Sequence, residues 1–289
     1  MERLRNLLQA GRAGNAVLFC GSGLTADCLN FQDELSLGVS SNLLSILNNE
    51  LKNHGKESGF KNIKNAAKSY KSIFGSHALM QLLKNRFHVS KVSSSIEDIL
   101  KYPWEAIYTT NYDNGIEIAL QGIGKKFAAR NNCDDPIQSS SSIEVIHLHG
   151  YAQSWDISNF DNSCILDSDS YRQLDSAQKW FGRLRSEIER ASVVIFVGFS
   201  VNDMHLDQVF FNSSGISGKS FFINKQTASP DADERAVQQD FGTPLYIGRE
   251  QLAEEISEVS RRAPPYRTSP CIIHALPPAD AKRLGPSGH

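Results

Sequence analysis

The sequence predicts an α/β protein built on a doubly wound, Rossmann-like parallel sheet. Short apolar runs alternate with helix-length segments along most of the 289 residues, which is typical of a parallel sheet covered by helices on both faces. The runs are almost wholly apolar, as expected for strands that are buried on both sides. Four of them end directly in polar or glycine-bearing turns, and sheets of this kind bind ligands at the carboxyl ends of their strands.

Six strands are expected where these runs fall, at residues 16–20, 106–109, 143–149, 192–198, 220–224 and 245–247. A helix is expected over 170–190, where Leu174, Leu184 and Ile188 belong to a core-facing stripe at helical spacing. A last helix, around 249–262, ends before Pro264 and Pro265, because proline cannot continue a helix.

The segment between the first two strands is too long for a single crossover connection. Its leucines predict a helical insertion subdomain over about residues 40–95, since they recur at helical spacing: Leu43, Leu44, Leu47, Leu51, Leu79, Leu82 and Leu83. We therefore expect one domain over residues 1–262 that contains this insertion. Residues 263–289 bear prolines and lack a clear pattern, which agrees with an extended arm, a linker toward a further domain or a disordered tail.

Charge and cysteine content argue against several classes of protein. Thirty Lys and Arg against 32 Asp and Glu give a net charge of -2, and the basic residues are scattered, which argues against binding of nucleic acid. No apolar run approaches the roughly 20 residues that cross a bilayer, so no membrane partner is expected. Five cysteines without a CxxC pair favour neither a disulfide framework nor a zinc site. We expect no metal and a cytoplasmic location.

The first polar turn, Gly21-Ser22-Gly23, follows the first strand and leads to Thr25. Its backbone amides are placed to approach a pyrophosphate. The third glycine of the usual dinucleotide fingerprint is absent. A tight turn that needs glycine for a positive φ is therefore an equal alternative.

The second turn contains Asn111, whose amide at a strand end can bond sugar hydroxyls and an ordered water together. Asp113 is placed to cap the helix that follows, a structural role that weighs at least as much as a role in the site.

In the third turn, we expect His147 and His149 to point to opposite faces of their strand, so that only one reaches the pocket. His149 lies beside Gly150 and is the candidate general base, because imidazole titrates near neutral pH. His147 is expected to be a hydrogen-bonded core residue.

The fourth turn begins at Gly198, which permits a close approach of backbone. Ser200 offers a hydroxyl to a phosphate or a ribose, and Asp203 is placed as a helix cap. Asn224 ends the next strand, where a second ribose can lie. Because all these turns sit at carboxyl ends of strands, we expect them to converge on one pocket.

In chain order, the runs GSGLT, TTNYD, HLHG, VGFSVND and FFIN resemble the motif set of the Sir2 superfamily, whose sirtuin members read GAGxS, TQNxD, LHG, GxS and an asparagine-bearing strand. The resemblance covers residues 16–262 apart from the helical insertion. The chain is most similar to bacterial Sir2-like proteins of antiphage defence, including the NAD-degrading effector type of Thoeris systems.

This resemblance implies NAD+ as ligand and substrate, with Asn111 and His149 as the catalytic pair. It also implies positions that hold the dinucleotide, which are Gly21, Gly23, Thr25, Gly198, Ser200 and Asn224; Ser22 and Asp113, from the same turns, complete the predicted binding set. Two sirtuin features are missing. The zinc ribbon has no counterpart, because residues 151–171 hold one cysteine. The acidic-aromatic-arginine segment is replaced at residues 27–31, so the usual walls of an acyl-lysine groove are lost.

Together with these two departures, the resemblance implies an NAD+ hydrolase that releases nicotinamide and ADP-ribose. It also implies a role in bacterial antiphage defence by NAD+ depletion, that is, by abortive infection. Such an enzyme endangers its own cell, so we expect a homo-oligomer or a partner defence protein to control it. Two alternatives remain: an NAD-dependent protein deacylase of the sirtuin type, and a non-catalytic regulatory module that binds NAD or ADP-ribose.

Overall fold

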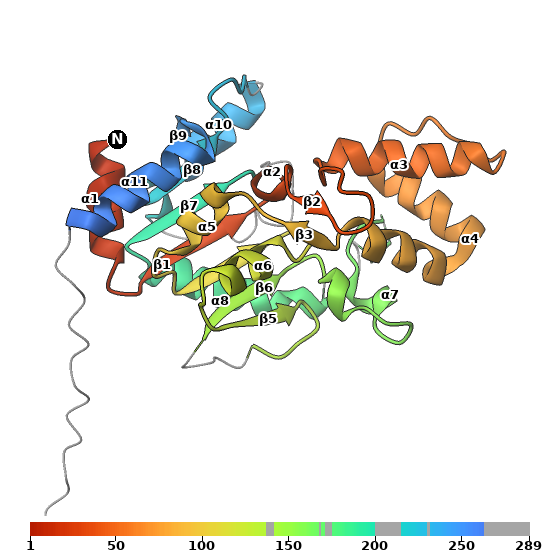
Figure 1. Ribbon diagram of the computed structural model, residues 1–289, viewed down its shortest axis with the longest axis horizontal. Helices are drawn as coiled ribbons and strands as arrows, with labels where there is room; N and C mark the ends of the chain where they lie inside the picture. Colours follow the sequence, from red (N-terminus) through yellow and green to blue (C-terminus); the bar gives the residue numbers. More distant parts are fainter. Residues whose placement is uncertain (137–141, 168, 171–174, 200–214, 230–231, 263–289) are drawn as a thin grey trace, which may run out of the picture.

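The computed structural model describes residues 1–136, 142–167, 169–170, 175–199, 215–229 and 232–262. Ser200, Asp203 and the 263–289 segment therefore lie outside the described residues. A seven-stranded sheet forms the centre of the molecule, with the strand order β5-β6-β4-β1-β7-β8-β9 (Figure 1). All of its neighbouring strands pair in parallel. The strands are β1 (Ala16–Cys20), β4 (Ala106–Thr109), β5 (Phe127–Asn131), β6 (Ile143–His147), β7 (Val193–Val197), β8 (Ser220–Asn224) and β9 (Thr243–Tyr246).

The chain winds outward from β1 in both directions, so the predicted doubly wound α/β fold is confirmed. After β1 it builds β4, β5 and β6 on one side, and it then returns to β7, β8 and β9 on the other. The order of the strands therefore reverses at β1, and a sheet of this kind opens a ligand crevice at such a point.

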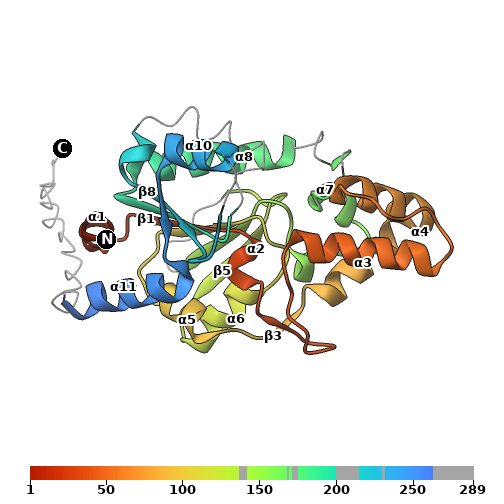
Figure 2. The same ribbon diagram turned by 90° about the horizontal axis from the view of Figure 1, so that it is seen from above.

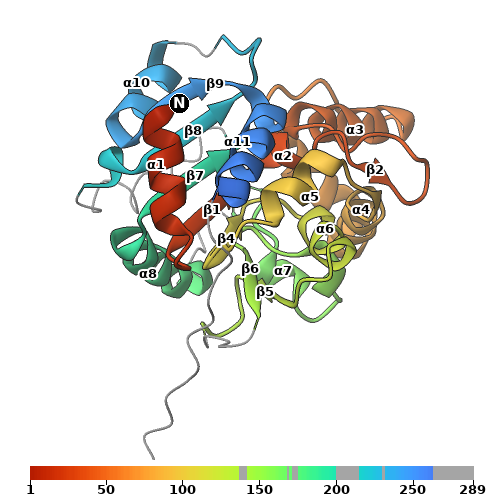
Figure 3. The ribbon, with the colours of Figure 1, turned by 60° about the vertical axis from the view of Figure 1, so that its left-hand side comes forward.

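Helices cover both faces of this sheet, as Figures 2 and 3 show from two directions. One face carries α1 (Glu2–Gly11), α5 (Ser94–Leu100), α6 (Gly115–Gly122) and α11 (Gly248–Arg262). The other carries α8 (Asp175–Arg190) and α10 (Ala232–Phe241). Two separate hydrophobic cores result, one between the sheet and each layer of helices.

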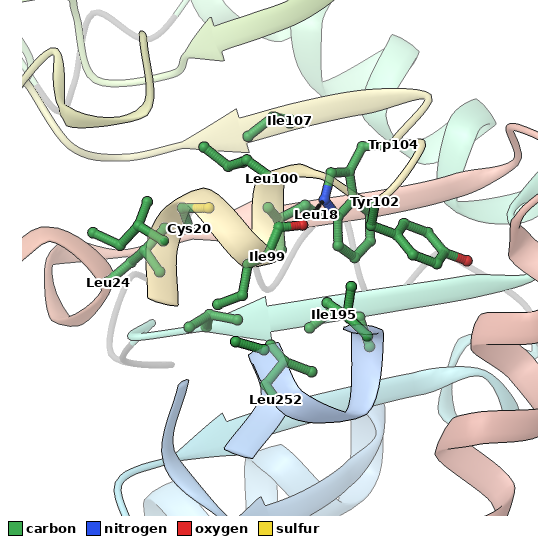
Figure 4. Packing of buried hydrophobic residues seen from close by; sticks show 14 of the residues in the cluster. Leu18, Cys20, Leu24, Ile99, Leu100, Tyr102, Trp104, Ile107, Ile195 and Leu252 are labelled. Carbon is green, nitrogen blue, oxygen red and sulfur yellow. Dashed lines mark hydrogen bonds between the residues drawn. The ribbon is translucent and has the colours of Figure 1, made fainter. Parts of the chain in front are cut away.

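Strand β1 shows why the strands read as unbroken apolar runs. Leu18 and Cys20 point into the first core, where Figure 4 shows them with Leu252 of α11. Val17 and Phe19 point into the second core, because successive side chains of a strand alternate between its faces. Each residue of β1 is thus buried by one core or the other, and the strand has no exposed position that would take a polar residue.

The helical insertion forms a third hydrophobic cluster beside the sheet domain (Figure 1). It consists of α3 (Ser40–Asn53) and α4 (Ile63–Arg86), which pack on each other, and α4 also packs on the short α7 (Phe160–Ser163). Helix α4 kinks at Gly75, whose φ is 86°. The predicted leucine stripes face this cluster, since Leu43, Leu47, Leu51, Leu79 and Leu83 are all buried in it. The insertion ends earlier than residue 95, because α5 packs into the first core of the sheet instead.

Smaller elements connect the insertion to the sheet. A single helical turn, α2 (Ser22–Thr25), follows β1, and β2 (Leu29–Asn30) pairs antiparallel with β3 (Val89–Lys91). Short 3-10 turns lie at η1 (Ala152–Ser154) and η3 (Ile216–Gly218). Within the described residues, no helix combines the length and the hydropathy that a membrane span requires.

Several strands differ from the sequence-based expectation, and β7 is one residue shorter at each end than the expected 192–198. Strand β5 was not expected, because it lies at an edge of the sheet and four of its five residues are only half-buried, so its sequence is mixed. Strand β6 ends at His147 rather than His149, since residues 148–150 form a turn. Strand β9 spans Thr243–Tyr246 rather than 245–247.

Candidate functional site

Four turns leave the sheet at the same level, which brings their side chains together. In the strand register, Cys20 pairs with both Thr109 and Val197, and Thr109 pairs with His147. The residues that follow these four positions therefore start from one edge of the sheet. They line a cavity of about 380 Å³, to which the turns contribute Gly21, Ser22, Thr25, Thr110, Asn111, Tyr112, Asp113, His149, Gly198 and Phe199.

The two glycines of the first turn are needed for close packing of backbone on backbone. A Cβ atom on Gly21 would lie 2.6 Å from Cα of Phe199, and one on Gly23 would lie 2.7 Å from Cα of Gly198. Neither glycine has a positive φ. The alternative of a tight turn that needs glycine for a positive φ was therefore wrong. Gly198 itself does have a positive φ, of 63°.

The amides of the first turn serve mainly to hold it in place. Gly21 N donates to the carbonyl of Val197 at 3.0 Å, and Gly23 N donates to the carbonyl of Gly198 at 2.9 Å. Of the three amides that we expected to approach a pyrophosphate, that of Ser22 makes no hydrogen bond with Gly198 or Phe199, the described part of the fourth turn. The turn therefore offers less of a phosphate cradle than the sequence suggested.

Asn111 is held in one orientation by two hydrogen bonds. Its Nδ2 donates to the carbonyl of Gly21 at 3.1 Å and to Thr25 Oγ1 at 3.0 Å. A carbonyl oxygen can only accept, so the amide nitrogen and not the amide oxygen must face Gly21. Both amide hydrogens are used in this way. What the side chain can still offer to a ligand in the cavity is Oδ1, an acceptor for a hydroxyl group or a water.

Thr25 and Asp113 complete this arrangement from behind. Thr25 Oγ1 donates to Asp113 Oδ2 at 2.8 Å, and Asp113 Oδ1 accepts from the amide of Gly115 at 2.9 Å. Asn114, not Asp113, occupies the N-cap position of α6, yet Asp113 still satisfies an amide of its first turn. Burial raises the pKa of the Asp113 carboxyl, and its bonds to Gly115 and Thr25 partly oppose this. Both residues line the cavity, but their polar groups form hydrogen bonds with each other, with Asn111 and with the first turn of α6.

Replacement of Thr25 by valine is expected to lower the free energy of unfolding by about 1–3 kcal/mol, because an Asn111 amide hydrogen and an Asp113 oxygen would lose a buried partner. Thr25→Ser keeps the hydroxyl and should lose less. Urea unfolding of both variants measures the difference. Equal stability of the valine and serine variants would contradict the hydrogen-bonded chain.

His149 lies on the wall of the same cavity as Asn111 and is 6% exposed. Its backbone carbonyl accepts from the amide of Ile165 at 3.0 Å, which fixes the turn. Gly150 is required next to it, since its φ is 104° and a Cβ atom would lie 2.5 Å from the carbonyl oxygen of Ser163. The turn that carries His149 is therefore closely packed on its outer side.

The expectation that His147 and His149 point to opposite faces of one strand was wrong. Residues two apart lie on the same face of a regular strand, so alternation alone would place His147 and His149 together. The structure separates them because the strand ends at His147 and the chain turns before His149. His147 is fully buried and bonded to the Asn111 carbonyl and to Glu117, each at 2.8 Å.

The outer wall of the cavity comes from the helical insertion and the loop before it, which sequence reasoning did not anticipate. This wall is largely apolar and consists of Leu37, Gly38, Val39, Ser40, Leu43, Ile63, Lys64 and Phe87, with Leu166 beside them. Leu43 was recognised as part of a helical stripe, but no pattern along the chain indicates that the stripe ends against the sheet. The insertion thus encloses the site as well as packing on itself.

A second cavity, of about 680 Å³, adjoins the first across Gly198 and Phe199, which line both. Gly23 and Asn224 face this second space, together with Arg249, which donates to the carbonyl of Leu24 at 2.6 Å. The amide of Asn224 is paired with that of Gln238, at 2.9 and 3.2 Å. The predicted site residues are therefore divided between two adjoining cavities, and Ser200 lies outside the described residues.

Ionisable groups give no sign of a metal centre in the part of the chain that is described. No cluster of three or more His, Cys, Asp or Glu is placed to hold an ion there. Four of the five cysteines are described and are free, and burial raises the pKa of the Cys20, Cys28 and Cys164 thiols.

Comparison with known proteins agrees with this arrangement. Residues 105–243 match the SIR2-like domain family. The match contains the second, third and fourth turns, and therefore Asn111, His149 and Gly198, while the first turn lies before it. Over these residues, the match agrees with the resemblance that the motifs suggested.

One curated bacterial protein is similar to part of this chain. Defense-associated sirtuin 2 of Bacillus subtilis is 26% identical over 140 residues, which are 48% of this chain and 14% of that protein. The chain thus corresponds to a small part of that relative.

Two solved structures are similar to this chain. A Sir2 structure described under "Structural Basis for the Mechanism and Regulation of Sir2 Enzymes" has a TM-score of 0.50 at 14% identity, covering 90% of this chain and 98% of that one. A mutant Sir2 homologue in complex with ADP ribose has a TM-score of 0.49 at 13% identity, covering 89% and 96%. The first of these likenesses shows a Rossmann-like Sir2 fold for the chain.

Proposed function

We propose that this chain is an NAD+ glycohydrolase that converts NAD+ and water into nicotinamide and ADP-ribose. The observation that carries the proposal is that Asn111 and His149 line one cavity at the point where the strand order of a Sir2-type sheet reverses. An acceptor amide oxygen and an imidazole at a shared wall are suited to hold a sugar and a water between them.

The two adjoining cavities suit the two halves of NAD+. The nicotinamide ribose would lie in the first cavity, against Asn111 and His149. The adenosine would lie in the second, near Asn224, with the pyrophosphate passing Ser22 and Gly198 between them. Thr25 and Asp113 would then contribute by orienting Asn111 rather than by touching the dinucleotide.

The reaction breaks the N-glycosidic bond at C1′ of the ribose through an oxocarbenium-like centre. Asn111 Oδ1 accepts a hydrogen bond from the ribose or from the attacking water, and His149 takes a proton as the water oxygen bonds to C1′. Nicotinamide leaves as a neutral molecule with the electron pair of the broken bond. The proton on His149 then passes to solvent, which restores the site.

Hydrolysis is favoured over protein deacylation because the chain lacks the zinc-ribbon cysteines and the segment that wall an acyl-lysine groove in sirtuins. With no peptide to deliver an acyl oxygen, water is the nucleophile. The name of the bacterial relative supports a role in defence, and we propose that NAD+ depletion limits phage growth by abortive infection. Control by self-assembly or by a partner defence protein belongs to this proposal.

Purified protein incubated with NAD+ is expected to release nicotinamide and ADP-ribose in equal amounts, resolved by chromatography. The assay is run alone, with an acylated peptide, and with candidate partner proteins. Release that requires the acylated peptide would establish deacylation instead. Saturable NAD+ binding without turnover under every condition would establish a binding module.

A further inference from the structure

His147 is an ionisable residue that contacts Asn111 and that the proposed reaction does not use. Its ring is fully buried beneath the cavity. Nδ1 lies 2.8 Å from the backbone carbonyl oxygen of Asn111, and Nε2 lies 2.8 Å from Glu117 Oε1 of helix α6. The ring of Tyr151 packs on it, with centroids 4.3 Å apart. The imidazole is therefore held on three sides.

The partners decide where the protons of this ring lie. The Asn111 carbonyl can only accept, so Nδ1 of His147 must carry a hydrogen. A second proton is shared between Nε2 of His147 and the carboxylate of Glu117. Nδ1 keeps its own hydrogen whether His147 or Glu117 holds this shared proton. Burial disfavours the charged ring, but Glu117 and the Asn111 carbonyl outweigh it and raise the pKa of His147.

Glu117 depends on this contact. Its second carboxylate oxygen, Oε2, is buried and has no hydrogen-bond partner among the residues that the structure describes, and Glu117 is only 4% exposed. A buried carboxylate is costly unless it is paired. The described structure offers it the ring of His147, so the two side chains stabilise one orientation of each other.

The same ring connects the two proposed catalytic residues. His147 lies two positions before His149 on one segment, while its Nδ1 holds the carbonyl of Asn111 on the neighbouring turn. The amide of Asn111 is held from the other side by Thr109 Oγ1 at 3.0 Å. Both backbone polar groups of Asn111 are thus fixed, one by its own strand and one by the segment that carries His149.

We propose that His147, oriented by Glu117, is a positioning residue that sets the placement of Asn111 relative to His149. The inference rests on the proposed NAD+ cleavage, in which both residues must address the same sugar carbon. A displacement of about 1 Å in such a site costs about 10²-fold in rate. The role differs from that of a packing residue, because it depends on one hydrogen bond at one nitrogen.

Two substitutions separate this bond from the rest of the side chain. The amide nitrogen of asparagine can occupy the place of Nδ1, and that of glutamine the place of Nε2. His147→Asn should therefore keep the bond to Asn111, while His147→Gln should keep only the contact with Glu117. We expect kcat for NAD+ cleavage to fall about 10²-fold in His147→Gln and about tenfold or less in His147→Asn, with KM changed little in both.

Steady-state kinetics of both variants test this expectation, with thermal unfolding as a check that each is folded. An equal loss of kcat in the two variants, a loss confined to KM, or no loss would overturn the proposal.

A spectroscopic measurement keeps the proposal testable apart from activity. The Asn111 carbonyl shares a peptide unit with the amide of Tyr112, so the ¹⁵N shift of Tyr112 reports the bond to His147. This shift should move in His147→Gln and stay near the wild-type value in His147→Asn. If the wild-type protein does not cleave NAD+, the proposed function is refuted. The ¹⁵N shift of Tyr112 would still decide whether His147 holds the carbonyl of Asn111. An unchanged shift in His147→Gln would overturn the inference even in an active enzyme.

Discussion

His149→Ala is expected to lower the rate of NAD+ cleavage by about 10²- to 10⁴-fold, the usual contribution of a general base. The side chain lies on the wall of the cavity that Asn111 shares. Without an imidazole there, the attacking water has no group in the proposed mechanism to take its proton. The effect is measured as the rate of nicotinamide release from NAD+ at neutral pH, with chromatography to quantify the nicotinamide.

The fold should survive this substitution, because the turn is held by its backbone. The His149 carbonyl accepts from Ile165, and the next residue is Gly150 with its required positive φ. His54→Ala is a matched control, since His54 is an exposed histidine at the end of α3, in the insertion. Full turnover by folded His149→Ala would remove the general base from the mechanism. Equal losses in both histidine variants would show that the effect is not specific to the site.

Gly198→Ala is expected to give the largest loss of stability among simple substitutions at the site, about 2–5 kcal/mol in the free energy of unfolding. The residue has a φ of 63°, which costs an L-residue about 1–2 kcal/mol. An added Cβ would also overlap the amide nitrogen of Leu24 and lie 2.6 Å from Cα of Gly23. Both are backbone atoms that cannot rotate away, and crowding of this kind adds about 1–3 kcal/mol. Urea unfolding measures the sum.

Gly124→Ala separates the two contributions. Gly124 has a similar φ of 71°, but a Cβ atom there would meet nothing within 4 Å. Gly124→Ala should therefore lower the free energy of unfolding only by the cost of the backbone conformation, about 1–2 kcal/mol. The excess loss in Gly198→Ala measures the crowding of the first turn against the fourth. Equal destabilisation by both substitutions would show that the two turns are not packed as closely as the structure has them.

The parts of the fold that could be predicted are those whose burial follows from local sequence. Strands β1, β4, β7 and β8 are short apolar runs because both of their faces are covered. Strand β5 escaped notice because it lies at the sheet edge with polar residues among its five. The leucine stripes of α3 and α4 predicted the insertion, but not that its side chains wall the cavity.

The sequence singled out several residues that line one cavity, but the partners that hold them could not be predicted. Asn111 and His149 were selected by residue type and by position at strand ends. That Thr25 and Asp113 hold Asn111 in place, and that Asn224 is paired with Gln238, depends on contacts between residues that are far apart in the chain. The two histidines show the same limit, since the end of β6 determines where each ring points.

The sequence by itself determined the doubly wound sheet and the turns that carry the site, because apolar periodicity and residue type are properties of neighbouring positions. Only the tertiary structure decided how Asn111 is oriented, why His149 and not His147 lies at the cavity, and that a helical insertion forms one of its walls. These outcomes depend on the strand register, which sets all four turns at one level, and on hydrogen bonds that form only after the chain has brought distant residues together.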